Sequence, residues 1–202
     1  MDKVQFLITD HGKNPPRGDD PEISGHRVLQ MRERDLPAIH QVCGLVDDKA
    51  DAVPCDRLQS LRLKGLEISP PLFLAPMAGL THSALRRLIL EQGGIGLLST
   101  EMLSAKRLPM ENAALSPYLV RAPQEIPLSY QLLVSRVEEV APAIAKLHAL
   151  QAEAIDLNLG CPAPTVRRMG AGSRLMEEPA LVQTLVAAAR KQTELPLTAK
   201  IR

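Results

Sequence analysis

From Leu66 onward, short apolar runs alternate with longer runs of helical periodicity, and this alternation restricts the fold more than any other feature. A helix between two strands lets the strands pair in parallel, so the repeated order predicts an α/β fold. Leu181, Leu185 and Ala189 recur every four residues, and Pro142 is expected to kink or restart its helix. We predict strands over 72–75, 96–100, 127–131, 154–158 and 197–201, helices over 82–92, 136–150 and 179–192, and a short helical piece in 165–170.

Several predicted strands carry polar side chains on one face, near their carboxyl ends. Successive side chains of a strand point to opposite faces, so residues two apart share a face. Burying such groups without partners is unfavourable, whereas gathering them at a barrel mouth or at the carboxyl edge of an open sheet removes that penalty. We therefore expect a site there; the alternative is a set of solvated strand ends. The polar sets are Ser99 with Glu101, Ser129 with Gln131, Asp156 with Asn158, and Thr198 with Lys200 and Arg202.

Residues 1–65 show no sustained periodicity and contain turn-forming stretches such as "DHGKNPPRGDDPEISGH". We divide the chain into an N-terminal extension over 1–65, irregular or partly disordered, and a regular domain over 66–202. His26, His40, Cys43 and Cys55 could be considered as zinc ligands, but their spacing matches no standard zinc motif. We expect no metal site.

Charge, cysteine content and hydropathy exclude several classes of protein. The net charge is +1, from 24 Lys+Arg and 23 Asp+Glu, so any nucleic-acid contact must rest on local patches. Three cysteines form no disulfide framework and are typical of a reducing cytoplasm. The N-terminus does not resemble a signal peptide, and no apolar run approaches the roughly 18 residues of a membrane span. We expect a cytoplasmic protein without a membrane partner.

Cys161 lies between Gly160 and Pro162, directly after the predicted strand over 154–158. Glycine permits a sharp turn and proline fixes one, so the turn would lift the thiol out of the strand end. A lone cysteine is more often a small buried core residue. The residues alone leave both interpretations open.

Five segments together resemble the tRNA-dihydrouridine synthases: "LAPMAGLTHSALRRL", "STEMLSAK", "YQLL", "DLNLGCPAPTVRRMGAGSRLM" and "LTAKIR". The resemblance runs from Leu72 to Arg202, and its most specific part is "NLGCP" followed by "GAG". It implies an FMN-dependent enzyme on a (β/α)8 TIM barrel that reduces the 5,6 double bond of uridines in tRNA, with NADPH as the electron donor. The "GAG" does not form a dinucleotide fingerprint, so NAD binding is not inferred from it.

The resemblance also implies roles for individual residues. Cys161 would be the proton donor, and Asn158 would hold the target uracil. Glu101 and Arg202 would be further substrate contacts. The flavin would be lined by Pro76, Met77 and Ala78, hydrogen-bonded by Gln131 and approached at its pyrimidine edge by Lys200.

Uracil reduction needs a hydride at carbon 6 and a proton at carbon 5. A thiol, with an ordinary pKa of about 8.5, is protonated near neutral pH and still gives up its proton readily, whereas a hydroxyl is too weak an acid. A cation near reduced flavin favours that state. Arg167 and Arg168 are the local basic candidates for tRNA phosphate, and a solvated loop pair is the alternative.

A TIM barrel has eight strands and about 250 residues, and only five strands are predicted here. We therefore expect an open edge at 197–201 and little or no FMN bound by this chain alone. It is either part of an active enzyme, a monomer at full length, or a short chain that cannot act alone. Two further hypotheses are a different FMN barrel that acts on a small molecule and an inactive remnant.

Overall fold

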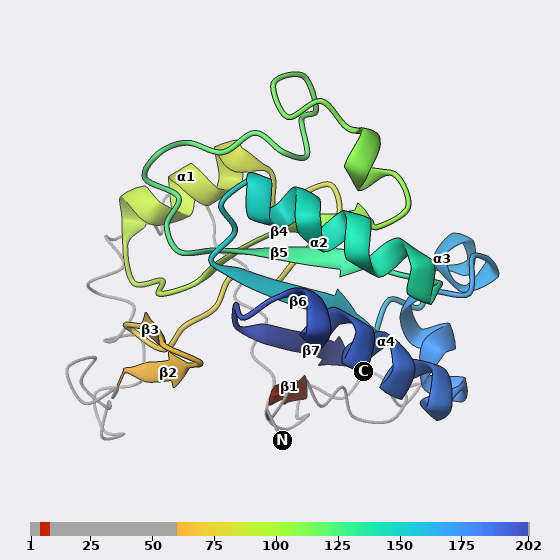
Figure 1. Cartoon of the computed structure of the whole chain (residues 1–202). Helices are drawn as coiled ribbons and strands as arrows, with labels where there is room; N and C mark the ends of the chain where they lie inside the picture. The colour runs from red at the N-terminus through yellow and green to blue at the C-terminus, as the bar shows by residue number, and fades with distance from the viewer. Residues whose placement is uncertain (1–4, 9–59, 202) are drawn as a thin grey trace, which may run out of the picture.

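A parallel sheet of five strands organises the chain (Figure 1). The computed structural model describes residues 5–8 and 60–201. The parallel pairing confirms the predicted α/β class. The described residues do not close this sheet into a barrel. In spatial order the strands are β1 (Gln5–Ile8), β7 (Leu197–Ile201), β6 (Ala154–Asn158), β5 (Leu128–Leu133) and β4 (Leu98–Ser104).

The helices connect consecutive strands and bury the apolar side chains between them and the sheet. Helix α2 (Val140–Ala149) joins β5 to β6, and α4 (Pro179–Gln192) joins β6 to β7. These two helices pack against each other and against one face of the sheet (Figure 1). The remaining helical elements are α1 (Ser83–Gln92), α3 (Pro164–Arg168), and the 3-10 segments η4 (Leu108–Met110), η5 (Val137–Glu139) and η6 (Gly172–Glu177).

Proline marks the start of two helices. The helix predicted over 136–150 is divided into η5 and α2, and Pro142 lies in the first turn of α2. The backbone N–H groups of a first turn have no partner within the helix, so proline is tolerated there. Pro179 likewise begins α4, whose bounds match the prediction.

Strand β1 (Gln5–Ile8) lies inside the N-terminal segment over 1–65, where no strand was predicted. A run of four residues is too short for periodicity to identify a strand. β1 pairs in parallel with β7, from Gln5 opposite Thr198 to Ile8 opposite Ile201. The edge that was expected to be open at 197–201 is therefore paired with β1 from Thr198 to Ile201.

A small hairpin precedes the sheet and was not predicted. β2 (Leu61–Leu63) and β3 (Leu66–Ile68) pair antiparallel across Lys64 and Gly65, which both have positive φ. A two-residue turn of this kind matches the right-handed twist of the strands. The hairpin packs Leu63 and Ile68 against Leu97, at the start of β4.

The strand predicted over 72–75 is reduced to one parallel bridge, between Phe73 and Leu97. Leu74 donates its backbone N–H to Leu97 at 2.9 Å, so this segment still runs beside the start of β4. Among the described residues, no helix is both long enough and apolar enough to cross a membrane.

Candidate functional site

A chain of buried polar side chains crosses β7, β6 and β5. Gln131, Asp156 and Thr198 are register partners on the three strands. Asp156 Oδ1 accepts the Thr198 hydroxyl at 2.6 Å, and Asp156 Oδ2 accepts the Gln131 amide at 2.6 Å. Asn158 Nδ2 donates to Gln131 Oε1 at 2.9 Å. The predicted gathering of polar side chains from neighbouring strands is thus observed, and its members satisfy one another.

The polar chain ends at the cysteine turn. Asn158 Oδ1 accepts the backbone N–H of Gly160 at 3.2 Å and that of Cys161 at 3.0 Å. Side-chain acceptors of this kind stabilise a tight turn directly after a strand. Cys161 is half-buried and is not in a disulfide. Its backbone is therefore held by a side chain from the end of β6.

The start of η6 closes the cysteine turn from the other side. Ser173 donates its backbone N–H to the Cys161 carbonyl at 3.0 Å. Gly172 has φ +60, and a Cβ there would lie 2.7 Å from Val166 Cγ1. Gly172 thus supplies both a left-handed backbone conformation and the space for close packing. Close backbone packing within "GAG" therefore occurs at Gly172.

Burial dominates the electrostatics of Asp156. It raises the pKa of this carboxyl above its ordinary value, although the hydrogen bonds from Thr198 and Gln131 and the charge of Lys200 act in the opposite direction. Lys200 is half-buried on β7, in register with Asn158. Its side-chain nitrogen forms no ion pair with any described carboxylate.

The loop over 76–82 lies against β4. Thr81 is fully buried, accepts the Met77 N–H through its hydroxyl and donates that hydroxyl to the Met77 carbonyl, both at 3.1 Å. Glu101 accepts the Gly79 N–H. Glu101 lies within β4, beyond the strand end predicted at residue 100, and the register with β5 shifts between Ser99 and Met102. Pro76 is half-buried, and Met77 and Ala78 are exposed.

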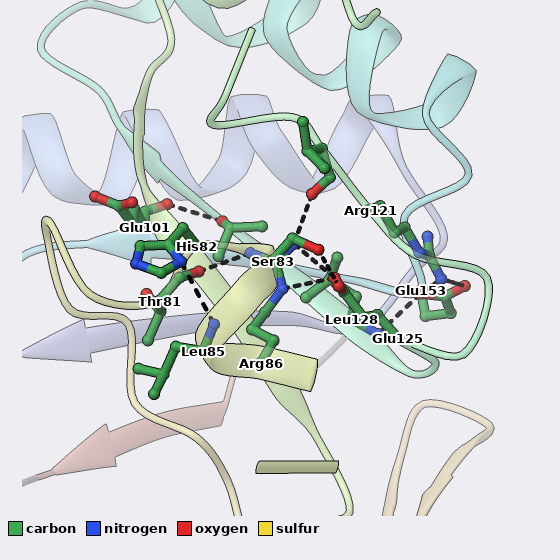
Figure 2. Close-up of polar contacts among 12 residues, drawn as sticks. Thr81, His82, Ser83, Leu85, Arg86, Glu101, Arg121, Glu125, Leu128 and Glu153 are labelled. Atoms are coloured by element: carbon green, nitrogen blue, oxygen red, sulfur yellow. Dashed lines mark hydrogen bonds and ion pairs between the residues drawn. The ribbon is translucent and has the colours of Figure 1, made fainter. Parts of the chain in front are cut away.

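A buried ion pair supports this loop from α1 (Figure 2). Arg86 Nε donates to Glu125 Oε2 at 2.7 Å, and Arg86 Nη1 donates to the Thr81 carbonyl at 2.6 Å. Both charged side chains are almost fully buried, at 1% and 0% exposure. A second pair, Arg121 with Glu153, holds the start of β5, where Glu153 accepts the Leu128 N–H at 2.9 Å (Figure 2).

A pocket of about 920 Å³ lies at the carboxyl-terminal half of β4. Of the predicted site residues, Ala78 and Glu101 line it, whereas Cys161, Asn158, Gln131 and Lys200 do not. Sequence reasoning missed Arg107 and Tyr118, because loop residues have no periodicity that would place them. The walls also include Gly79, His82, Glu111 and Asn112.

The basic candidates differ in their surroundings. Arg167 donates to Glu177 at 2.6 Å and to Ser173 at 3.2 Å. Arg168 is exposed and forms no ion pair with a described residue. Arg202 lies outside the described residues, as do His26, His40, Cys43 and Cys55. Within the described ranges, no group of three or more His, Cys, Asp or Glu residues could hold a metal ion.

The polar chain contains two amide side chains, and Lys200 lies beside it. Gln131 uses one of its two amide protons and one carbonyl lone pair within the chain, and its side chain is almost fully buried, at 2% exposure. Lys200 adds a cation at the carboxyl end of the next strand but one. Amide side chains and a cation are types of group that contact flavin rings in proteins.

Comparison with known proteins gives a consistent result. The sequence model of the family described as "Dihydrouridine synthase (Dus)" matches residues 73–202. A probable tRNA-dihydrouridine synthase 1 of Synechocystis is 30% identical over 70% of this chain and 40% of the relative. A tRNA-dihydrouridine synthase B of Klebsiella pneumoniae is 33% identical over 70% and 44%, and a probable tRNA-dihydrouridine synthase of Mycobacterium tuberculosis is 35% identical over 71% and 39%. The matched part of the chain spans about two fifths of the length of these relatives.

Proposed function

This chain belongs to the dihydrouridine synthase family, and on that premise we propose that it reduces the 5,6 double bond of uridine in tRNA to dihydrouridine. The observation that carries the proposal is the link between Asn158 and the Cys161 turn. These bonds hold the backbone of Cys161, a half-buried residue just past the carboxyl end of β6, and Asn158 at that end is in register with Lys200 on β7. A proton donor for a flat, uncharged ring needs such a fixed and accessible position.

We propose FMN as the cofactor and NADPH as the electron donor. Gln131 and Lys200 would hold the ring at its hydrogen-bonding edge, and Pro76, Met77 and Ala78 would contact it from the loop beside β4. FMN, when bound and reduced, supplies the hydride for carbon 6 of uracil. The exposed Met77 and Ala78 leave apolar surface on this loop for such a contact.

Cys161 is the proposed general acid. Its thiol delivers the proton to carbon 5, because a thiol gives up a proton far more readily than a serine hydroxyl does. The hydrogen bonds from the Gly160 and Cys161 N–H groups to Asn158 keep the backbone of the turn fixed while the side chain reacts.

Asn158 is the proposed uracil contact, through one particular proton. Its Nδ2 donates one proton to Gln131, and the other faces Met102 Sδ at 3.7 Å, a weak acceptor. A uracil carbonyl would be a stronger acceptor in that place. Glu101, at the wall of the pocket, is the further candidate for the imide N–H.

Contacts with the tRNA backbone are proposed for Arg168 and Arg167, and Arg202 is proposed as a further substrate contact. Arg168 is exposed and close in sequence to the cysteine turn, as a phosphate ligand beside a flipped base should be. A tRNA substrate places the proposed activity in the cytoplasm. The relatives are named tRNA-dihydrouridine synthases, which favours tRNA over a small-molecule substrate.

The test is the reaction of the protein, as its gene encodes it, with unmodified tRNA, FMN and NADPH, read by mass spectrometry of the nucleosides. The wild type should form dihydrouridine. Cys161→Ser should lower the rate by at least about 100-fold, the contribution of one general acid, while FMN binding is retained. A Cys161→Ser protein with the wild-type rate would contradict the role of the thiol, and a wild type that reduces no tRNA would contradict the proposed function.

A further inference from the structure

Asp156 occupies the centre of the polar chain, and neither the proposed reaction nor the cofactor uses it directly. It is 8% exposed and lies on β6 between strands β5 and β7. Each carboxylate oxygen accepts one hydrogen bond, from Thr198 on one side and Gln131 on the other, both at 2.6 Å. A buried carboxylate with both oxygens engaged imposes a direction on its neighbours, because an ionised carboxylate can only accept.

The donor and acceptor order set by Asp156 determines the order at the next side chains. Because Asp156 accepts, Gln131 must turn its amide nitrogen toward Asp156 and its carbonyl oxygen toward Asn158. Asn158 must then present its nitrogen to Gln131, which leaves its oxygen for the turn. That oxygen accepts the Gly160 and Cys161 N–H groups. If the Gln131 amide were reversed, its nitrogen would face the nitrogen of Asn158. Asn158 would then have to reverse as well, and its nitrogen would face the N–H groups of Gly160 and Cys161.

We propose that Asp156 is a positioning residue, because it fixes the orientation of the Gln131 and Asn158 amides. Through these two side chains it holds the backbone of the Cys161 turn. The consequence for catalysis rests on the proposed function, whereas the hydrogen-bond polarity does not. The requirement is for an acceptor at residue 156, not for a negative charge.

Substitutions separate polarity from charge. Asp156→Leu removes the acceptor and frees Gln131 to reverse. Asp156→Asn keeps an acceptor for Gln131, because its nitrogen can donate to Thr198, whose hydroxyl can rotate to accept. Gln131→Glu sets two acceptors against each other. Gln131→Glu combined with Asp156→Asn restores the order, since the amide introduced on β6 would donate to the carboxylate introduced on β5, which still accepts from Asn158.

The control for simple loss of stability is Thr198→Val. It removes one hydrogen bond to Asp156 but leaves the other carboxylate oxygen to accept Gln131. The direction of the chain beyond Asp156 is therefore unchanged, and the Cys161 turn should be unaffected.

The experiment measures alkylation of Cys161 by iodoacetamide in the folded 202-residue chain, with the Cys161 peptide followed by mass spectrometry so that Cys43 and Cys55 do not contribute. Hydrogen exchange of the 160–161 amides is the second readout. Asp156→Leu and Gln131→Glu should each change both rates several-fold, on the order of 10-fold, as expected for lost hydrogen bonds. Asp156→Asn, Thr198→Val and the double variant should remain within about twofold of the wild type.

The inference would be overturned if Asp156→Leu kept the wild-type alkylation and exchange rates, or if Thr198→Val changed them as much as Asp156→Leu does. It would also be overturned if the double variant changed these rates as much as Gln131→Glu does. If Asp156→Leu does not fold, the comparison of Gln131→Glu with the double variant still decides it. A protein that reduces no tRNA but shows the predicted pattern of thiol reactivity would remove the proposed function and leave this inference in place.

Discussion

The backbone of Gly172 lies directly against Cys161: a Cβ on Gly172 would come 2.6 Å from the Cys161 carbonyl oxygen and 3.1 Å from the Cys161 Cβ. The N–H of the next residue, Ser173, donates to the same carbonyl at 3.0 Å. The conformation of the Cys161 turn thus depends on the absence of a side chain at Gly172. The spacing of the two residues in the sequence does not reveal this contact.

Gly172→Ala should therefore displace the cysteine turn. Gly170→Ala is the matched control, because Gly170 also has positive φ, at +73, but a Cβ there would meet nothing within 4 Å. Both variants carry the strain of a left-handed alanine, about 1–2 kcal/mol, and only Gly172→Ala adds a steric clash. Urea unfolding should show the larger loss of stability for Gly172→Ala, and only this variant should alter alkylation of Cys161. Equal effects of the two variants would contradict the packing argument.

The buried pair of Arg86 and Glu125 should be important for stability and for the loop over 76–82. Glu125→Gln leaves the guanidinium without a counter-charge, and breaking a buried pair costs about 3–5 kcal/mol. Hydrogen exchange should rise in the loop, because Arg86 also donates to the Thr81 carbonyl.

Glu138→Gln is the control for that substitution, since Glu138 pairs with Arg136 at 3.9 Å on the surface, where both side chains are more than two thirds exposed (74% and 72%). Exposed pairs contribute about 0–1 kcal/mol. Free energies of unfolding from urea titrations measure both effects. A Glu125→Gln variant as stable as Glu138→Gln would show that the buried pair is not a structural element of the loop.

Asp156 predicts a pH dependence of stability. Burial raises the pKa of its carboxyl above the ordinary value of 3.8. The folded protein then binds the Asp156 proton more tightly than the unfolded chain does. The stabilisation that comes from this proton is complete below the ordinary pKa and is lost as the pH rises through the raised pKa of the folded protein. Asparagine does not titrate.

The free energy of unfolding of the wild type minus that of Asp156→Asn should therefore decrease as the pH rises from the ordinary pKa of Asp156 through its raised value, and stay constant above it. Urea unfolding at a series of pH values measures the difference, and the other carboxyl groups cancel. A difference that increases with pH would show that Thr198, Gln131 and Lys200 together outweigh burial.

Arg167 and Arg168 should contribute unequally to tRNA binding. Arg168 is free of ion pairs among the described residues, whereas Arg167 is engaged by Glu177. Arg168→Ala should weaken tRNA binding and lower the salt slope of the binding constant by about 1, the effect of one lost phosphate contact. Arg167→Ala should have the smaller effect. Fluorescence anisotropy at several salt concentrations measures both, and an unchanged slope in Arg168→Ala would contradict a phosphate contact.

The strands and helices with strong, sustained patterns could be predicted from the sequence. The bounds of β6, β7 and α4 agree with their predicted ranges, because alternation and the fourfold recurrence extend over the whole element. β1 and the β2–β3 hairpin were missed, since strands of three or four residues are too short to show a period. The segment over 72–75 is apolar but has only one bridge, because an apolar run does not specify its partner.

The candidate site was predicted in part. Alternation placed Gln131, Asp156, Asn158 and Thr198 at neighbouring strand ends, and the structure joins them by hydrogen bonds. The direction of those bonds could not be predicted, because it depends on which amide atom faces which neighbour. The pocket beside Glu101 could not be predicted either, since Arg107 and Tyr118 come to it through loop geometry.

The central claim, reduction of tRNA uridine with Cys161 as the proton donor, is tested most directly by the dihydrouridine content of tRNA from a strain in which the gene for this chain is deleted. Mass spectrometry of the tRNA should show dihydrouridine lost at one or more positions, restored by the intact gene and not by a Cys161→Ala version. Unchanged dihydrouridine in the deletion strain, or full restoration by Cys161→Ala, would contradict the account.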